Sequence, residues 1–230
     1  MDAQRPSGAV RIASGKVHVE GILAWPDEPH GLVVFAHGSG SGRLSPRNNY
    51  VADVLRRAGF ATLLMDLLTP AEDSDYARRF DIDLLVERLV DALRFLDGDA
   101  ATAALPIGAF GASTGAAAAL RLAAAEPTRV QAVVSRGGRP DLAGVEALAA
   151  VRAPTLLIVG GLDFDVIRLN QAALREIDAV KELTIVPGAT HLFEESGTLE
   201  RVAALAADWF RRHLGGATAD DGSSSIRSAP

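Results

Sequence analysis

The chain has 230 residues, of which 48% are hydrophobic and 23% charged, and it contains no cysteine. This length and composition fit one globular domain with a sizeable core. A net charge of −6 disfavours non-specific nucleic-acid binding, which depends on neutralising phosphates. The lack of cysteine excludes disulfide and thiolate chemistry. Because we find neither a signal peptide nor an apolar run of the roughly 18 residues that span a membrane, we expect a cytoplasmic protein with no membrane partner.

Two short alternating segments come first in the chain, at about 9–13 and 16–24, and predict an antiparallel hairpin. Continuous apolar runs then predict strands buried on both faces. They lie at 31–38, 60–67, 105–110, 130–135, 153–161 and 182–188. Between them, Ser45-Pro46 and Asp81 are typical helix starts. One face of a last helix carries Leu199, Val202, Ala206, Trp209 and Phe210.

This alternation of strands and helices predicts an α/β fold with a mostly parallel sheet and helices on both faces. We expect a single domain over 1–214 and a disordered tail over 215–230, where Gly, Ser and Asp dominate. Ligands of such sheets bind beyond the carboxyl ends of the strands. The segments HGSGSGR, GASTG, LDFD and GATHLFEE follow predicted strands and hold most of the unusual chemistry.

The first of these candidates is Ser113, in the sequence G-A-S-T-G at 111–115. A nucleophilic serine at a sharp strand-to-helix turn needs small residues two before and two after it, and Gly111 and Gly115 occupy these positions. The helix that follows would favour an oxyanion through its positive end. The alternative is a serine that simply caps an alanine-rich helix.

A serine hydroxyl needs a base, and the base needs an acid that orients it. His191 follows the last predicted strand at the expected edge of the sheet, and the order nucleophile, acid, base favours it. For the acid we choose Asp163, directly after the run TLLIVGG, with Asp165 as its competitor. Asp163 could also cap the following helix.

The glycines of HGSGSG at 37–42 allow backbone N–H groups to face a developing negative charge. We expect the oxyanion-hole donors to be the N–H groups of Thr114 and Ser39, with Gly40 as the alternative to Ser39. His37 is expected to order this loop by hydrogen bonding. A phosphate-binding loop is disfavoured because no Lys-Ser/Thr pair follows the glycines.

Several arginines lie in loops at the same predicted edge: Arg43, Arg47, Arg136 and Arg139. The simplest reading of each is a solvated surface residue. Their convergence motivates the hypothesis that Arg43, Arg136 and Arg139 bind a carboxylate or another anionic group of the substrate.

Together, FAHGSGSG, GAFGASTG, TLLIVGGLDFDV and PGATHLFEE resemble the α/β-hydrolase superfamily, and within it the dienelactone-hydrolase-like group. The resemblance spans about 31–214. It implies an eight-stranded, mostly parallel sheet, the triad Ser113, Asp163 and His191, and an oxyanion hole at Ser39 and Thr114. Dienelactone hydrolases use a cysteine nucleophile where this chain has serine. The short segment at about 136–152 leaves no room for a cap domain, which predicts a shallow pocket bordered by 67–80, 136–145 and 190–197.

The sequence thus predicts a serine hydrolase that cleaves a small carboxylic ester, thioester or lactone through an acyl-enzyme on Ser113. Its partner is a small-molecule substrate, and no cofactor or metal is expected. The oligomeric state stays open. Two alternatives remain: acyl transfer or perhydrolysis with the same triad, and a non-catalytic binding module on the hydrolase fold.

Overall fold

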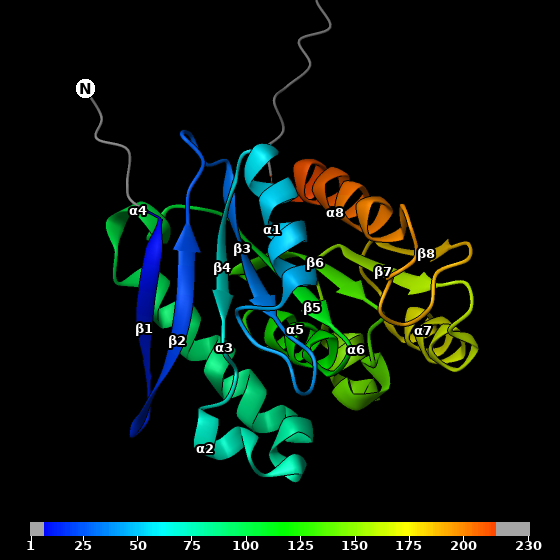
Figure 1. The fold of residues 1–230 in the computed structure, drawn as a ribbon, viewed down its shortest axis with the longest axis horizontal. Coiled ribbons are helices and arrows are strands. Elements are labelled where there is room, and N and C mark those ends of the chain that lie inside the picture. Colours follow the sequence, from blue (N-terminus) through cyan, green and yellow to red (C-terminus); the bar gives the residue numbers. More distant parts are fainter. Residues whose placement is uncertain (1–6, 215–230) are drawn as a thin grey trace, which may run out of the picture.

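The computed structural model describes residues 7–214, and an eight-stranded sheet runs through its centre (Figure 1). The strand order is β1-β2-β4-β3-β5-β6-β7-β8. The predicted hairpin is β1 and β2, and β2 also pairs antiparallel with β4, whereas the remaining neighbours are parallel. The tail at 215–230 lies outside the described residues. The strands are β1 Gly8–Ser14, β2 Val17–Ala24, β3 Gly31–Ala36, β4 Phe60–Met65, β5 Ile107–Ala112, β6 Val130–Arg136, β7 Thr155–Gly160 and β8 Lys181–Val186.

Helices cover both faces of the sheet, which confirms the predicted fold class (Figure 1). Side chains of the central strands alternate between two cores, as Val33 and Phe35 show on one face and Leu32 and Val34 on the other. One face carries α1 (Pro46–Arg57) and α8 (Thr198–Leu214). The other carries α3 (Ile82–Asp97), α5 (Thr114–Ala125), α6 (Val145–Ala150) and α7 (Phe164–Glu176).

The helix starts follow the capping signals in the sequence. The Ser45 side chain accepts a hydrogen bond from the first turn of α1, and Asp81 accepts one from the Leu84 N–H at 3.1 Å. Short helical turns lie in connections to which the sequence analysis assigns no element. They are α2 (Pro70–Asp73), the 3-10 turn η1 (Tyr76–Phe80), α4 (Ala100–Ala103) and the 3-10 turn η2 (Pro140–Ala143).

The direction in which the chain winds changes between β3 and β5, which are neighbours in the sheet. The chain leaves β3 toward α1 on one face and leaves β5 toward α5 on the other. The loops at the carboxyl ends of these two strands therefore diverge, and this is where open α/β sheets bind ligands. In the described part of the chain, the 137–154 connection holds only η2 and α6, so no cap domain covers this edge.

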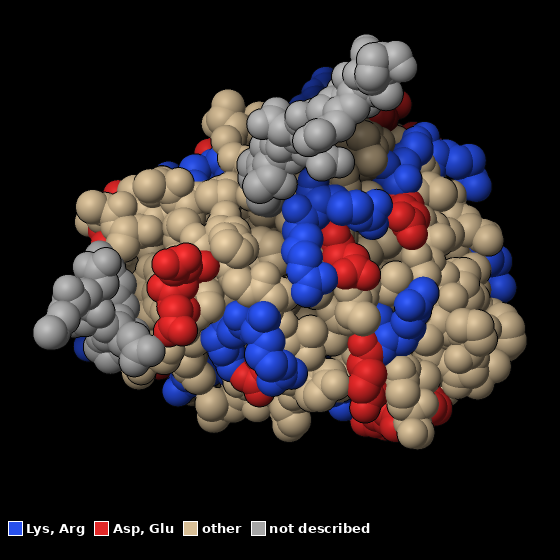
Figure 2. All heavy atoms as spheres, turned by 90° about the horizontal axis from the view of Figure 1, so that it is seen from above, with Lys and Arg blue, Asp and Glu red and all other residues tan. Residues whose placement is uncertain are grey.

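The surface carries charges of both signs. On the face shown in Figure 2, basic and acidic side chains lie in small adjoining groups, with no broad area of one sign. No helix within residues 7–214 combines the length and apolarity needed to cross a membrane.

Candidate active site

Ser113 joins β5 to α5. Its backbone dihedral angles, φ 51° and ψ −120°, are rare for residues other than glycine. Two hydrogen bonds hold this turn. The Ser113 N–H donates to the Arg136 carbonyl at 3.2 Å, and the Ser113 carbonyl accepts from the Arg139 N–H at 3.0 Å. Backbone strain of this kind is typical of functional sites, where the surrounding structure enforces it.

The two glycines of G-A-S-T-G allow this turn to pack tightly. A Cβ on Gly111 would lie 2.4 Å from the Cα of Ala116, and one on Gly115 would lie 2.2 Å from the carbonyl oxygen of Ala36. Both contacts are with backbone, which cannot move aside cheaply. Steric crowding by the backbone therefore explains why both positions need glycine, as expected from the sequence.

The Ser113 hydroxyl faces the ring of His191, whose Nε2 lies 3.3 Å from Oγ. On the other side of the ring, Nδ1 lies 2.6 Å from Oδ2 of Asp163. Nδ1 therefore carries the proton and donates a hydrogen bond to the carboxylate, which leaves Nε2 free to accept one. The structure thus brings together the three side chains that the sequence analysis singled out.

The geometry bears on two alternatives that the sequence left open: helix capping by Ser113 or Asp163, and Asp165 as the acid. Ser113 and Asp163 both occupy the N-cap positions of helices, but neither side chain makes a capping hydrogen bond. Asp165, the competing acid, is an exposed residue paired with Arg168 on α7. The geometry therefore favours Asp163 as the partner of His191.

The loop after β8 is anchored on both sides of His191. Glu195 accepts hydrogen bonds from the Thr190 hydroxyl at 2.6 Å and the Thr190 N–H at 3.1 Å, and these bonds hold the pKa of Glu195 below its usual value. Glu194 pairs with Arg47 at the start of α1 at 2.9 Å. Phe193 is buried at φ 56°, another rare conformation for a side chain of this size.

The loop after β3 lies against the start of α5. The Ser39 N–H donates to Oγ1 of Thr114 at 2.9 Å, so one expected oxyanion donor is bonded to the side chain of the other. His37 is buried, with Nδ1 donating to the Gly38 carbonyl at 2.8 Å and Nε2 accepting from the Leu67 N–H at 2.9 Å. Burial lowers the pKa of His37, which keeps the ring neutral. His37 therefore orders the loop, as the sequence predicts.

Most of the arginines at this edge already have carboxylate partners. Arg43 pairs with Asp66, and Arg139 with Asp141 at 2.7 Å. Arg136 differs from them because it is buried, and burial lowers its pKa to about 10. Its guanidinium lies over the ring of Phe193, 5.9 Å from the centroid. Among the described residues, its Nε and Nη1 have no hydrogen-bond partner.

A small hollow beside the oxyanion loop is lined in part by Leu67, Leu68, Leu85 and the pair Asp73–Arg79. All of these except Leu85 lie within 67–80, one of the segments that the sequence analysis placed at the border of the pocket, but it gave none of them an individual role. In residues 7–214 no group of three or more His, Cys, Asp or Glu side chains is arranged to hold a metal ion.

The fold and this edge of the sheet define an α/β hydrolase. Residues 31–184 match the family model described as the alpha/beta hydrolase fold, and the chain belongs to this family. More particularly, it is dienelactone-hydrolase-like: a dienelactone hydrolase from Anabaena variabilis is 54% identical in sequence, with a TM-score of 0.88 over 92% of this chain and 100% of that one.

Two curated relatives have names other than dienelactone hydrolase. A Mycobacterium tuberculosis protein named as a phosphoribosyl transferase is 60% identical over 207 residues, 90% of this chain but 46% of that protein. A Bradyrhizobium protein named as a 2-oxo-3-(5-oxofuran-2-ylidene)propanoate lactonase is 29% identical over 171 residues, 64% of this chain and 69% of that protein. The chain thus spans about half the length of the mycobacterial relatives it matches. The family and the Anabaena structure support a hydrolase.

Proposed function

We propose that the protein is a serine hydrolase that cleaves a small carboxylic ester, thioester or lactone. The observation that carries this proposal is the continuous chain of hydrogen-bonding side chains from Asp163 through His191 to Ser113, at the switch point of the sheet. The family supports the reaction class. The name of the mycobacterial relative gives no reaction to this chain in our proposal. Because the match covers 46% of that protein, we propose that phosphoribosyl transfer belongs to the part outside the match.

In the first half of the reaction, Oγ of Ser113 bonds to the carbonyl carbon of the substrate while its proton passes to Nε2 of His191. Asp163 stabilises the imidazolium that forms. The 3.3 Å separation of Oγ and Nε2 is at the long end of a hydrogen bond and is expected to shorten when substrate binds. The bond between the carbonyl carbon and the leaving group then breaks, and the leaving atom takes the proton from Nε2.

In the second half, water attacks the acyl carbon while His191 accepts its proton. The bond to Oγ breaks, Ser113 recovers its proton from His191, and the acid is released. The negative charge on the carbonyl oxygen would be met by the N–H of Thr114 and by that of Ser39. The Ser39 N–H now donates to the Thr114 hydroxyl, so we propose that it transfers to the oxyanion as charge develops.

The anion hypothesis stays a separate prediction. Arg43 and Arg139 have carboxylate partners, which weighs against a free cation at these two positions. Arg136 is buried and its Nε and Nη1 have no hydrogen-bond partner among the described residues, so the hypothesis depends on Arg136.

The proposal is tested with Ser113→Ala. We expect kcat to fall by on the order of 10^4 to 10^6-fold on any ester the wild type hydrolyses. A fluorophosphonate probe should label the wild type and not the variant. Ser196→Ala, which removes an exposed serine from the loop that follows His191, is the matched control and should keep both activity and labelling. Undiminished turnover by Ser113→Ala would refute the assignment, and a wild type that neither turns over esters nor reacts with the probe would favour a binding module.

A further inference from the structure

The buried face of α7 holds a polar side chain. Of the three buried residues of this helix, Val166, Asn170 and Ala173, only Asn170 is polar, and it is fully buried. Its Nδ2 donates to the Val166 carbonyl at 2.8 Å and to the Gly138 carbonyl at 3.0 Å. Because both neighbours are carbonyl oxygens, they fix which end of the amide faces them. Asn170 therefore joins α7 to the connection that follows β6.

Packing of the helix alone does not explain an amide at this position. The Oδ1 of Asn170 is buried and has no hydrogen-bond partner among the described residues. A buried acceptor without a partner destabilises the folded chain, whereas an apolar side chain of the same shape, such as leucine, avoids this cost. The bond to Gly138 reaches outside α7 and indicates what the amide contributes.

Gly138 lies directly against the start of α5. A Cβ on Gly138 would lie 2.6 Å from the Cβ of Ala116, which is in the first turn of that helix. The peptide group between residues 138 and 139 is held at both ends. Its carbonyl accepts the hydrogen bond from Asn170, and its N–H, that of Arg139, donates to the Ser113 carbonyl at 3.0 Å. One rigid peptide plane thus connects Asn170 to the turn at the nucleophile.

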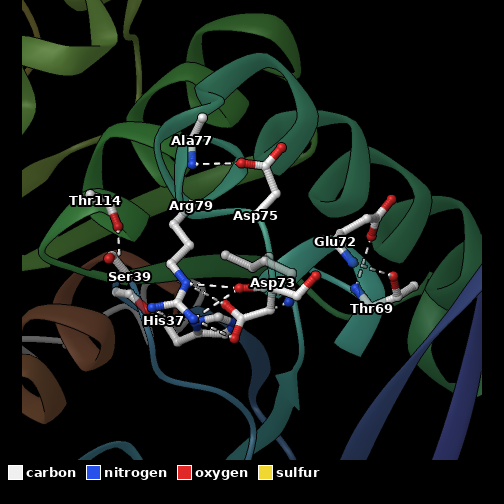
Figure 3. A network of polar contacts seen from close by, with 12 residues as sticks. His37, Ser39, Thr69, Glu72, Asp73, Asp75, Ala77, Arg79 and Thr114 are labelled. Carbon is white, nitrogen blue, oxygen red and sulfur yellow. Dashed lines mark hydrogen bonds and ion pairs between the residues drawn. The ribbon is translucent and has the colours of Figure 1, made fainter.

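The same connection continues through the next peptide group. The Ser113 carbonyl shares its peptide plane with the Thr114 N–H, the proposed oxyanion-hole donor. This carbonyl also accepts from the Ala116 N–H at 3.1 Å, and the Thr114 hydroxyl accepts from the Ser39 N–H at 2.9 Å (Figure 3). Hydrogen bonds in such a chain polarise one another. The bond from Asn170 therefore helps both to orient the Thr114 N–H and to strengthen it as a donor.

We propose that Asn170 is a positioning residue for the oxyanion hole and acts on the Thr114 N–H through these two peptide groups. The proposal rests on the proposed function of Ser113. Asn170 is hydrogen-bonded to no side chain of the triad. Its effect falls on the transition state, in which the carbonyl oxygen of the substrate carries charge, and not on the binding of the neutral ester.

The test replaces Asn170 with leucine, which keeps the shape of the side chain and removes both hydrogen bonds. We expect kcat for p-nitrophenyl butyrate to fall by about tenfold, with KM changed by less than about twofold. This loss is smaller than the roughly 10²–10³-fold that follows removal of an oxyanion donor, because the Thr114 N–H itself remains. Titration of the active serine with the fluorophosphonate probe corrects kcat for unfolded protein.

A charged adduct gives a second measurement. When an aryl trifluoromethyl ketone binds, Oγ of Ser113 bonds to the ketone carbon, its proton passes to His191, and the former carbonyl oxygen carries the negative charge. The adduct therefore resembles the tetrahedral intermediate. We expect the inhibition constant of this ketone to rise in Asn170→Leu by about the same factor by which kcat falls.

The pH profile separates this role from a displaced triad. Asp163 lies at the start of α7, so a shift of the helix would also disturb its contact with His191. The acid limb of kcat/KM follows protonation of the catalytic base. We expect Asn170→Leu to lower the plateau of the profile and to leave the midpoint of the acid limb in place.

Ala173→Gly is the matched control. Ala173 is buried on the same face of α7, and its side chain forms none of these hydrogen bonds. Glycine should weaken the helix but keep the wild-type kcat per active serine and the wild-type affinity for the ketone. If Asn170→Leu cannot be purified, Asn170→Ala removes the same two bonds and should give the same kinetic pattern.

The outcomes separate the two proposals. An unchanged kcat, a loss that Ala173→Gly shares, or a shifted acid limb would overturn the role of Asn170 and leave Ser113 as the nucleophile. So would a fall in kcat without a matching change in ketone affinity. Ester turnover that survives Ser113→Ala, or a wild type inert toward both ester and ketone, would overturn the proposed function and the role of Asn170 with it.

Discussion

The two sides of Ser113 are built in different ways. On the β7–β8 side, His191 is hydrogen-bonded to the serine at 3.3 Å and to Asp163 at 2.6 Å. On the β3–β4 side, the Ser39 N–H donates to the Thr114 hydroxyl beside a small hollow, and ion pairs join α2 to η1 and to α3 around it. One side of Ser113 is therefore arranged by side chains at strand ends, whereas the other is arranged by segments that those side chains do not touch.

The β7–β8 side gives the largest expected effect. Asp163→Asn should lower kcat by on the order of 10^4-fold, because an amide cannot hold the Nδ1-protonated imidazole or stabilise its charge. Asp165→Asn is the control two residues away. It should leave kcat within about twofold, since Asp165 is exposed and forms only a surface pair with Arg168. Steady-state kinetics on one ester checks both, and similar losses in the two variants would remove Asp163 from its proposed role.

The oxyanion loop gives an intermediate effect. Thr114→Val removes the acceptor of the Ser39 N–H but keeps the shape of the side chain. We expect kcat to fall by about tenfold, the value of one net hydrogen bond, because the amide loses the contact that orients it. Thr114→Ser keeps the hydroxyl and should restore most of the rate. If valine and serine behave alike at this position, the hydroxyl does not position the amide.

Arg136 is expected to show the smallest effect and to decide between two roles. Arg136→Ala should lower kcat/KM only a few-fold, because one cation–π contact of about 0.5–2 kcal/mol to Phe193 is lost. Comparing p-nitrophenyl butyrate with the hemisuccinate of similar size, we expect equal losses, since the guanidinium supports the His191 loop. A loss confined to the hemisuccinate would instead support the anion hypothesis.

The sequence predicts the β7–β8 side well because its signals are local. Buried parallel strands appear as apolar runs, and Asp163 and His191 follow such runs directly, so topology alone places them at one edge. Gly111 and Gly115 add a second local signal, because the need for glycine at these positions depends only on close contacts with neighbouring backbone. The sheet, its hairpin and the main helices are predicted for the same reason.

The β3–β4 side could not be predicted in the same way. The pairs Arg79–Asp73 and Arg88–Glu72 join side chains within 67–80 and connect this segment to α3, and the charge pattern of the sequence does not show which carboxylate an arginine will meet. The arginines at the edge show the same limit. Arg43 and Arg139 look like free cations in the sequence, and only the folded chain shows that Asp66 and Asp141 lie beside them.

Ser113 is held by backbone packed on backbone at Gly111 and Gly115, and by hydrogen bonds to the main chain of neighbouring segments. The leucines that line the small hollow, Leu67, Leu68 and Leu85, come from other parts of the chain. Substitutions at Leu68 or Leu85 therefore remove none of the contacts named here that hold the turn at Ser113, and the turn and the hollow can vary separately in evolution.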